Sequence, residues 1–252
     1  MSDLRLISRI DIKGENVVKG FQMEGLRKIG IPKIIASQYY KEGIDEIVIN
    51  DVVASLYDRK QIIELIRVAA SDFFIPLTVI GGIRSLEDAR KLFMNGADKI
   101  GVNTAALNNP NLLKEIADNY GSQALVLSIE AKKDKNGHWL AYSNSGRTNS
   151  GKMVSAWIEE SLSYGVGEIL LTSVDRDGTL NGFDMELLIS ISDSIPVPLL
   201  IGGGISTTEH VKNIVKKPYV DGIVIGRALH DNLLKIENIK SACLEVGRKV
   251  RR

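Results

Sequence analysis

The sequence GIDEIVIND at residues 43–51 recurs as GVGEILLTS at residues 165–173, an offset of 122 positions. Two further pairs of stretches repeat at almost the same offset: IGGIRS at 80–85 with GGGIST at 202–207, and DKIGVNTAAL at 98–107 with DGIVIGRALH at 221–230. Matches in one order at a nearly constant offset indicate an internal duplication. We therefore expect two homologous halves, at about residues 1–122 and 123–252.

Short β-branched runs alternate with stretches of helical period along the chain. The predicted strands are residues 6–12, 46–51, 76–80, 98–102, 124–129, 168–173, 197–201 and 221–225. The predicted helices are residues 33–42, 60–70, 85–95, 109–119, 151–164, 184–194, 207–216 and 227–246. Continuously apolar strands are typical of parallel strands covered by helices.

Eight β-then-α units predict an α/β fold of the (β/α)₈ TIM barrel class, built from two half-barrels as one domain over residues 1–252. A doubly wound sheet is the alternative fold, but it does not predict the repeat.

The composition is that of an ordinary globular protein, with 44% apolar residues, 25% charged residues and a net charge of +1. These values give no general attraction to nucleic acid or to a membrane surface, and no stretch reaches the roughly 20 apolar residues of a membrane span. Cys243 is the only cysteine, so we expect no intrachain disulfide, a buried thiol and a cytoplasmic location. The three histidines are scattered, and we expect neither a metal nor a cofactor.

Glycine pairs and polar residues follow the predicted strands in both halves. Gly81, Gly82, Asn103 and Thr104 follow the third and fourth strands, and Gly203, Gly204, Gly226 and Arg227 follow the seventh and eighth. In such barrels these positions share one mouth, and glycine lets backbone N–H groups approach an anion closely. The pattern predicts two phosphate sites on opposite sides of the mouth, and hence a long substrate with a phosphate at each end.

Two carboxylates stand between these predicted phosphate sites. Asp11 ends the first strand in SRIDIK, and Glu130 ends the fifth in LSIEAK, so they face each other across the barrel axis. Opposed carboxylates are the usual equipment for general acid and general base catalysis. Thr172 and Asp177, at and after the sixth strand, line the same mouth. The alternative interpretation is a pair of surface acids at loop starts.

The opposite mouth of the predicted barrel is also charged. Arg5, Glu46, Lys99 and Glu168 lie at or just before the amino ends of four strands, and Glu46 and Glu168 are partners in the repeat. Such residues form either a solvated rim or a salt-bridged plug over the barrel core.

The chain contains RIDIK, VVKG, PLTVIGGIRSLEDA, GADKIGVNTAA, YGSQA, GRTNSG and GEILLTSVDRDGT. With these motifs it resembles, over nearly its whole length, the cyclase subunit of imidazole glycerol phosphate synthase, the HisF family of histidine biosynthesis. The resemblance implies a duplicated barrel that receives ammonia from a glutaminase docked at the amino-terminal face. It implies that the ammonia is added to a bis-phosphorylated ribulosyl aminoimidazole carboxamide, which is cleaved and cyclised to imidazole glycerol phosphate and an aminoimidazole carboxamide ribotide.

The resemblance also implies roles for single residues. Asp11 matches the first catalytic aspartate, and Lys19 the lysine of the mobile loop over the substrate. Gly82, Asn103 and Thr104 match one phosphate site, and Gly203, Gly204, Gly226 and Arg227 occupy the other. Arg5, Glu46, Lys99 and Glu168 match an ionic gate over the ammonia passage, and Asp98 matches a residue of the glutaminase interface.

Three stretches differ from the usual pattern of this family. Glu130 stands where the second catalytic aspartate is expected, SRID replaces PCLD before Asp11, and IGRALH after the eighth strand is more similar to the sister phosphoribosyl isomerase family. An added methylene moves a carboxylate by roughly 1 Å, a scale that matters for catalysis. The alternative function is therefore a cyclase-like paralogue that channels ammonia from a glutaminase to a sugar amidotransferase in surface-glycan biosynthesis.

Overall fold

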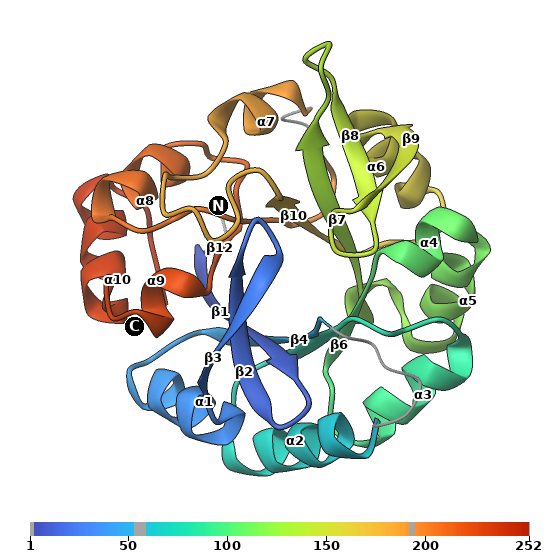
Figure 1. The fold of residues 1–252 in the computed structure, drawn as a ribbon, viewed down its shortest axis with the longest axis horizontal. Helices are drawn as coiled ribbons and strands as arrows, with labels where there is room; N and C mark the ends of the chain where they lie inside the picture. Colours follow the sequence, from blue (N-terminus) through green and yellow to red (C-terminus); the bar gives the residue numbers. More distant parts are fainter. Residues whose placement is uncertain (1–2, 53–58, 192–194, 252) are drawn as a thin grey trace.

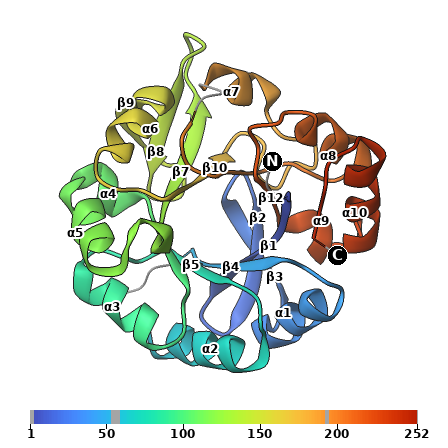
Figure 2. The same cartoon turned by 180° about the vertical axis from the view of Figure 1, so that it is seen from behind.

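The computed structural model describes residues 3–52, 59–191 and 195–251. Within these ranges eight parallel strands form a closed ring, and helices surround the ring on its outside (Figures 1 and 2). Around the ring the strands are β1 (Arg5–Lys13), β4 (Glu46–Asp51), β5 (Leu77–Ile80), β6 (Lys99–Val102), β7 (Leu125–Lys133), β10 (Glu168–Ser173), β11 (Leu199–Gly202) and β12 (Gly222–Ile225). Because β12 pairs with β1 and β10 pairs with β7, the ring of eight parallel strands is closed. The predicted (β/α)₈ TIM barrel is confirmed, and the doubly wound sheet is excluded.

The outer layer consists of helices that follow the strands. They are α1 (Pro32–Lys41), α2 (Arg59–Asp72), α3 (Leu86–Met94), α5 (Asn111–Tyr120), α6 (Val154–Leu162), α7 (Met185–Ser190), α8 (Thr208–Val215) and α10 (Ile236–Glu245), with the shorter α4 (Thr104–Asn108), η1 (Ser122–Ala124) and α9 (Arg227–His230). In the described ranges, none of these helices has the length and apolar character needed to cross a membrane. Cys243 on α10 is buried, as predicted.

Three predicted helices are interrupted or shifted. The helix expected at 151–164 begins only at Val154, because residues 151–153 belong to the strand β9 (Thr148–Met153). A single helix over 227–246 is wrong, because α9 ends before Asn232, whose φ of 54° lies in the left-handed region. The helix expected at 109–119 begins only after Pro110, because the residue before a proline is held out of the helical region; Asn109 has φ −143° and ψ 89°. Residues 192–194 of the predicted helix 184–194 lie outside the described residues.

Two antiparallel hairpins extend the barrel, and the sequence patterns did not predict them. The hairpin strands are β2 (Asn16–Phe21), β3 (Glu24–Gly30), β8 (Trp139–Ser143) and β9 (Thr148–Met153). β2 pairs with β1, and β8 pairs with β7. The same insertion after the first strand of each half agrees with the expected duplication, which remains a prediction. In the view of Figure 1, the β2–β3 hairpin lies in front of the barrel opening.

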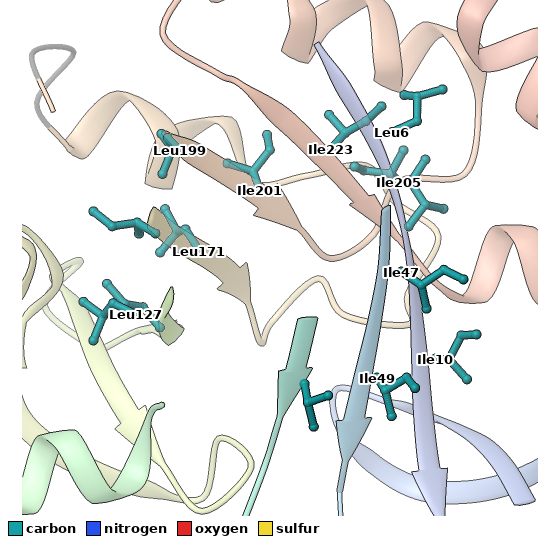
Figure 3. Packing of buried hydrophobic residues seen from close by; sticks show 14 of the residues in the cluster. Leu6, Ile10, Ile47, Ile49, Leu127, Leu171, Leu199, Ile201, Ile205 and Ile223 are labelled. Carbon is teal, nitrogen blue, oxygen red and sulfur yellow. The ribbon is translucent and has the colours of Figure 1, made fainter. Parts of the chain in front are cut away.

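Apolar side chains form two separate clusters because successive residues of a strand point to opposite faces. The larger cluster fills the space between the strands and the helices; Figure 3 shows Leu6, Ile10, Ile47 and Ile49 among its members. The smaller cluster lies inside the barrel and consists of Ile7, Val48, Ile80, Val126, Leu170, Leu200 and Val224. Charged side chains lie on both sides of this cluster along the barrel axis, Arg5 and Glu46 toward the amino ends of the strands and Arg9 and Asp11 toward the carboxyl ends.

Candidate active site

A cavity of about 760 Å³ opens at the carboxyl ends of the barrel strands. Of the predicted site residues, Asp11, Gly82, Asn103, Thr104, Glu130, Thr172 and Asp177 line it. A much smaller cavity of about 20 Å³ beside it is lined by Lys19, Gly203, Gly204, Gly226 and Arg227. Arg9 and Asp177 line both cavities, so they form the partition between them. The structure therefore brings all the predicted residues of this mouth to one region.

The first predicted phosphate site is built from the loop after β5 and the start of α4. Gly81 and Gly82 have φ of 91° and 68°, and a Cβ atom on Gly81 would lie 2.3 Å from the Asp51 carbonyl oxygen, so only glycine fits there. The Asn103 side chain donates from Nδ2 to the Tyr142 carbonyl oxygen at 3.0 Å. Its buried Oδ1 has no hydrogen-bond partner among the described residues. Thr104 Oγ1 accepts from the Asn144 backbone N–H at 3.0 Å.

The second predicted site lies between the loops after β11 and β12. Gly203 and Gly204 have φ of 109° and 82°, and a Cβ atom on Gly204 would lie 2.2 Å from the Gly182 carbonyl oxygen. The Arg227 guanidinium donates from Nη1 to the Gly178 carbonyl oxygen and from Nε to Asp231 at 3.1 Å. Arg227 therefore joins the loop after β10 to α9 across this smaller cavity.

The Asp11 carboxylate is buried and fully hydrogen-bonded at the end of β1. Oδ1 accepts from Arg9 Nε at 2.7 Å and from Asn50 Nδ2 at 2.6 Å, and Oδ2 accepts from Lys19 Nζ at 2.7 Å. Burial by itself raises the pKa of Asp11, but the charges of Arg9 and Lys19 outweigh it and hold the pKa well below its ordinary value. Asp11 is thus kept ionised and can accept a proton only when this network rearranges.

Glu130, which also lines the cavity, has a different environment from Asp11. Its Oε2 accepts from the Gly146 backbone N–H at 2.8 Å. Burial raises the pKa of Glu130 above its ordinary value, although the Gly146 hydrogen bond and the Arg9 charge oppose this shift. Two carboxylates whose pKa values are moved in opposite directions fit separate acid and base roles.

Lys19 reaches the site from the β2–β3 hairpin. Its side chain is only 3% exposed, and Nζ donates to Asp11 and, at 3.1 Å, to Asp177 Oδ2. The Gln22 backbone N–H donates to the Asp177 carbonyl oxygen at 2.7 Å, which fixes the hairpin to the loop after β10. In this structure the hairpin is therefore closed over the mouth.

The four charged residues predicted at the amino-terminal mouth meet in one ion-paired cluster. Arg5 donates to Glu46 at 3.1 Å and to Glu168, and Lys99 contacts Glu46 at 3.2 Å and Glu168 at 2.9 Å. The side chains of Glu46 and Glu168 are 1% and 5% exposed, which agrees with a plug and not with a solvated rim. Thr78, a residue that the sequence patterns did not single out, donates to Glu46 at 2.7 Å.

Asp98, expected at a partner interface, caps a strand within this chain. Its Oδ2 accepts from the Leu77 backbone N–H at 2.8 Å. Asp221, its partner in the repeat, accepts from Leu199 N at 3.0 Å in the same way. The interface role of Asp98 remains a prediction.

Three hydrogen-bond partners of Asp11 and Glu130 escaped prediction: Arg9, Asn50 and Gly146. Arg9 and Asn50 precede Asp11 and Asp51 on their strands, so a strict period-two reading would have placed Arg9 beside Asp11 on the inward face. Gly146 contributes only a backbone N–H, for which a sequence holds no signal. In the part of the chain that is described, no three His, Cys or carboxylate side chains are grouped to hold a metal ion.

Comparisons with known proteins place the chain in a family. The sequence profile of the family described as "Histidine biosynthesis protein" matches residues 5–235. The chain is 47% identical over 209 residues to the imidazole glycerol phosphate synthase subunit HisF of Legionella pneumophila, covering 83% of this chain and 99% of that protein.

Two further relatives match over nearly the whole chain. HisF of Streptococcus sanguinis strain SK36 is 39% identical over 247 residues, covering 98% of each chain. HisF of Myxococcus xanthus strain DK1622 is 39% identical over 247 residues, covering 98% of this chain and 97% of that protein. The chain therefore belongs to the histidine biosynthesis protein family, among the HisF subunits of imidazole glycerol phosphate synthase.

Proposed function

We propose that this chain is the cyclase subunit of a glutamine-dependent imidazole glycerol phosphate synthase, a lyase-type enzyme. It uses ammonia from a glutaminase subunit to convert the bis-phosphorylated ribulosyl aminoimidazole carboxamide into imidazole glycerol phosphate and an aminoimidazole carboxamide ribotide. The observation that carries the proposal is the opposed pair Asp11 and Glu130 between two glycine-lined anion sites in one mouth.

The anion sites hold the two phosphates and so place the middle of the substrate against the carboxylates. Addition of ammonia to a carbonyl carbon requires one proton to reach the oxygen and another to leave the nitrogen. Glu130, whose pKa is raised, fits the proton donor, and Asp11, which is ionised, fits the acceptor. Cleavage and ring closure need proton transfers on the same two sides of the substrate. In these steps Asp11, once protonated, acts as the proton donor, and Glu130, once ionised, acts as the acceptor.

The closed hairpin supports this assignment. Lys19 forms ion pairs with both Asp11 and Asp177 and so holds the hairpin over the mouth. A substrate that enters must displace or reorganise these contacts, which frees Asp11 for proton transfer. Exclusion of water by the hairpin would also protect a reactive imine from hydrolysis.

The ion-paired cluster at the other mouth fits the entry point for ammonia. It closes the amino-terminal end of the barrel directly below the apolar interior cluster. We propose that the glutaminase docks on this face and that Arg5, Glu46, Lys99 and Glu168 gate the passage. The names of the curated relatives do not favour the alternative of a sugar amidation paralogue.

The test is to supply purified protein with the bis-phosphorylated substrate and an ammonium salt and to follow both products by chromatography. We expect turnover, and we expect Asp11→Asn to reduce the rate by at least roughly 100-fold because the proton acceptor is lost. Asp118→Asn makes the same chemical change on an exposed part of α5 and serves as the matched control. Absence of turnover by the wild type, or equal rates for the wild type and Asp11→Asn, contradicts the proposal.

A further inference from the structure

Arg9 is a buried cation whose hydrogen-bonding capacity is largely unused. Its side chain is 9% exposed, and Nε donates to Asp11 at 2.7 Å. A guanidinium carries five N–H donors in a planar fork. No described residue accepts a hydrogen bond from Nη1 or Nη2, so four of the five donors have no protein partner.

The place of Arg9 explains what can reach these donors. Arg9 lines both cavities, whereas the loops with Gly82 and Gly203 each line only one of the two described here. A molecule with one phosphate in each cavity must therefore cross the partition formed by Arg9 and Asp177. Its middle portion then covers the Arg9 guanidinium.

Covering unpaired donors has a consequence for selectivity. A methylene chain over Nη1 and Nη2 would remove them from water without an acceptor, which is unfavourable, whereas an oxygen at that position would accept their hydrogen bonds. A carbonyl oxygen has two lone pairs and can therefore accept hydrogen bonds from both Nη1 and Nη2. Arg9 thus discriminates between bis-phosphates that carry a hydrogen-bond acceptor between the two phosphates and those that do not.

The charges around Arg9 decide between a neutral and an anionic acceptor. Arg9 and Lys19 are already balanced by Asp11 and Asp177. Glu130, in the same cavity, adds either no charge or one more negative charge. Within this group of five side chains no positive charge is left over, so an uncharged oxygen fits better directly beside Arg9 than a further carboxylate.

We propose that Arg9 is a specificity-determining residue, which donates hydrogen bonds from Nη1 and Nη2 to an uncharged carbonyl or carboxamide oxygen in the middle of a bis-phosphorylated ligand. The proposal rests on the proposed function in that the substrate carries two phosphates. It does not depend on turnover.

The test uses two synthetic bis-phosphates of equal length, one with an all-methylene chain and one with a single amide group at its centre. Their dissociation constants are measured by isothermal titration calorimetry with the purified chain. The wild type should bind the amide compound roughly 10- to 100-fold more tightly, as expected for hydrogen bonds from a charged group. In Arg9→Met this preference should vanish, while the methylene compound binds as before or more tightly.

Two further variants control the comparison. Arg67→Met removes the same charge from an exposed position on α2 and should leave both dissociation constants unchanged. Arg9→Lys keeps the charge beside Asp11 but lacks the fork, so the preference should fall below roughly threefold. If thermal unfolding shows that Arg9→Met does not fold, the amide preference of Arg9→Lys is the result that tests the proposal.

Each contrary result overturns the proposal. These are equal binding of the two compounds by the wild type, a preference kept in Arg9→Met or Arg9→Lys, an equal loss of both affinities, and binding of neither compound. Failure of the proposed function gives a different result: the amide preference depends on Arg9, but the ribulosyl aminoimidazole carboxamide is not consumed with ammonium.

Discussion

Replacing Glu130 by aspartate tests whether the longer side chain at this position is adapted to its surroundings. Glu130 Oε2 lies 2.8 Å from the Gly146 backbone nitrogen. Removing one methylene withdraws the carboxylate by about 1.5 Å, the length of a carbon–carbon bond, and lengthens this contact to roughly 4 Å. That distance is outside the range of a hydrogen bond.

The loop that carries Gly146 is poorly able to follow the shortened side chain. Gly146 has a φ of 73°, and a Cβ atom on it would lie 2.7 Å from Val174 Cγ1, so the loop backbone is already packed against Val174. Loss of a hydrogen bond to a buried carboxyl group costs about 1–3 kcal/mol. Misplacement of a catalytic group by about 1 Å costs up to about 100-fold in rate. We expect Glu130→Asp to slow the reaction roughly 10- to 100-fold.

The assay is the ammonium-dependent conversion of the bis-phosphorylated substrate at saturating concentration, so that the rate reports on proton transfer and not on binding. Glu159→Asp, a change of the same kind on the exposed side of α6, should have no effect. A Glu130→Asp rate equal to or above that of the wild type would refute the reasoning. It would mean that the contact with Gly146 does not position the carboxyl group.

Three further expectations follow from other contacts. Lys99→Met removes one of the two cations that join Glu46 and Glu168. The glutamine-dependent rate measured with a glutaminase partner should therefore change several-fold relative to the ammonium-dependent rate, and an unchanged ratio would argue against a gate. Burial, followed by the charge of Lys19, lowers the pKa of His230 to about 4. A lowered histidine pKa stabilises the fold above about pH 6.5, and this stabilisation is lost as the pH falls toward 4. Urea titrations of the wild type and of His230→Gln should show this loss. The unfolding free energy of the wild type, relative to that of the variant, should decrease by roughly 2–3 kcal/mol between pH 7 and 4. Gly81→Ala places a Cβ atom 2.3 Å from a backbone oxygen at a φ of 91° and should lower the melting temperature by several degrees, whereas Gly247→Ala, with a φ of 76° and open space, should lower it less.

The barrel was predictable because its strands are continuously apolar and because stretches of the sequence recur at an offset of about 122 residues. The hairpins were not, and the reason is physical. β3 and β9 are mostly exposed, so neither has the alternation of apolar and polar residues by which a strand is recognised. Their extended form depends on pairing with β2 and β8, which lies beyond a local pattern.

The candidate site was predictable where its residues end strands and recur in the repeat, as Asp11, Gly82 and Gly203 do. The sequence left two alternatives for the charged residues at the amino-terminal mouth, a salt-bridged plug and a solvated rim. It could not decide between them, because the burial of Glu46 cannot be read from the sequence. Arg9 was missed as a site residue because a buried arginine is credible only once its carboxylate partner is seen at 2.7 Å.

Because the apolar core is divided into two clusters, substitutions that alter the active site can occur at different positions from those that alter the stability of the fold. Most of the buried apolar surface lies between strands and helices, where a substitution alters stability. Among the described residues the cluster inside the barrel consists of seven aliphatic side chains, so new polar groups introduced along the axis beyond these seven leave the outer cluster intact. A gene duplicate of such a protein can therefore accumulate substitutions along the axis, including an arginine at position 9, and change which molecules it accepts before it loses the ability to fold.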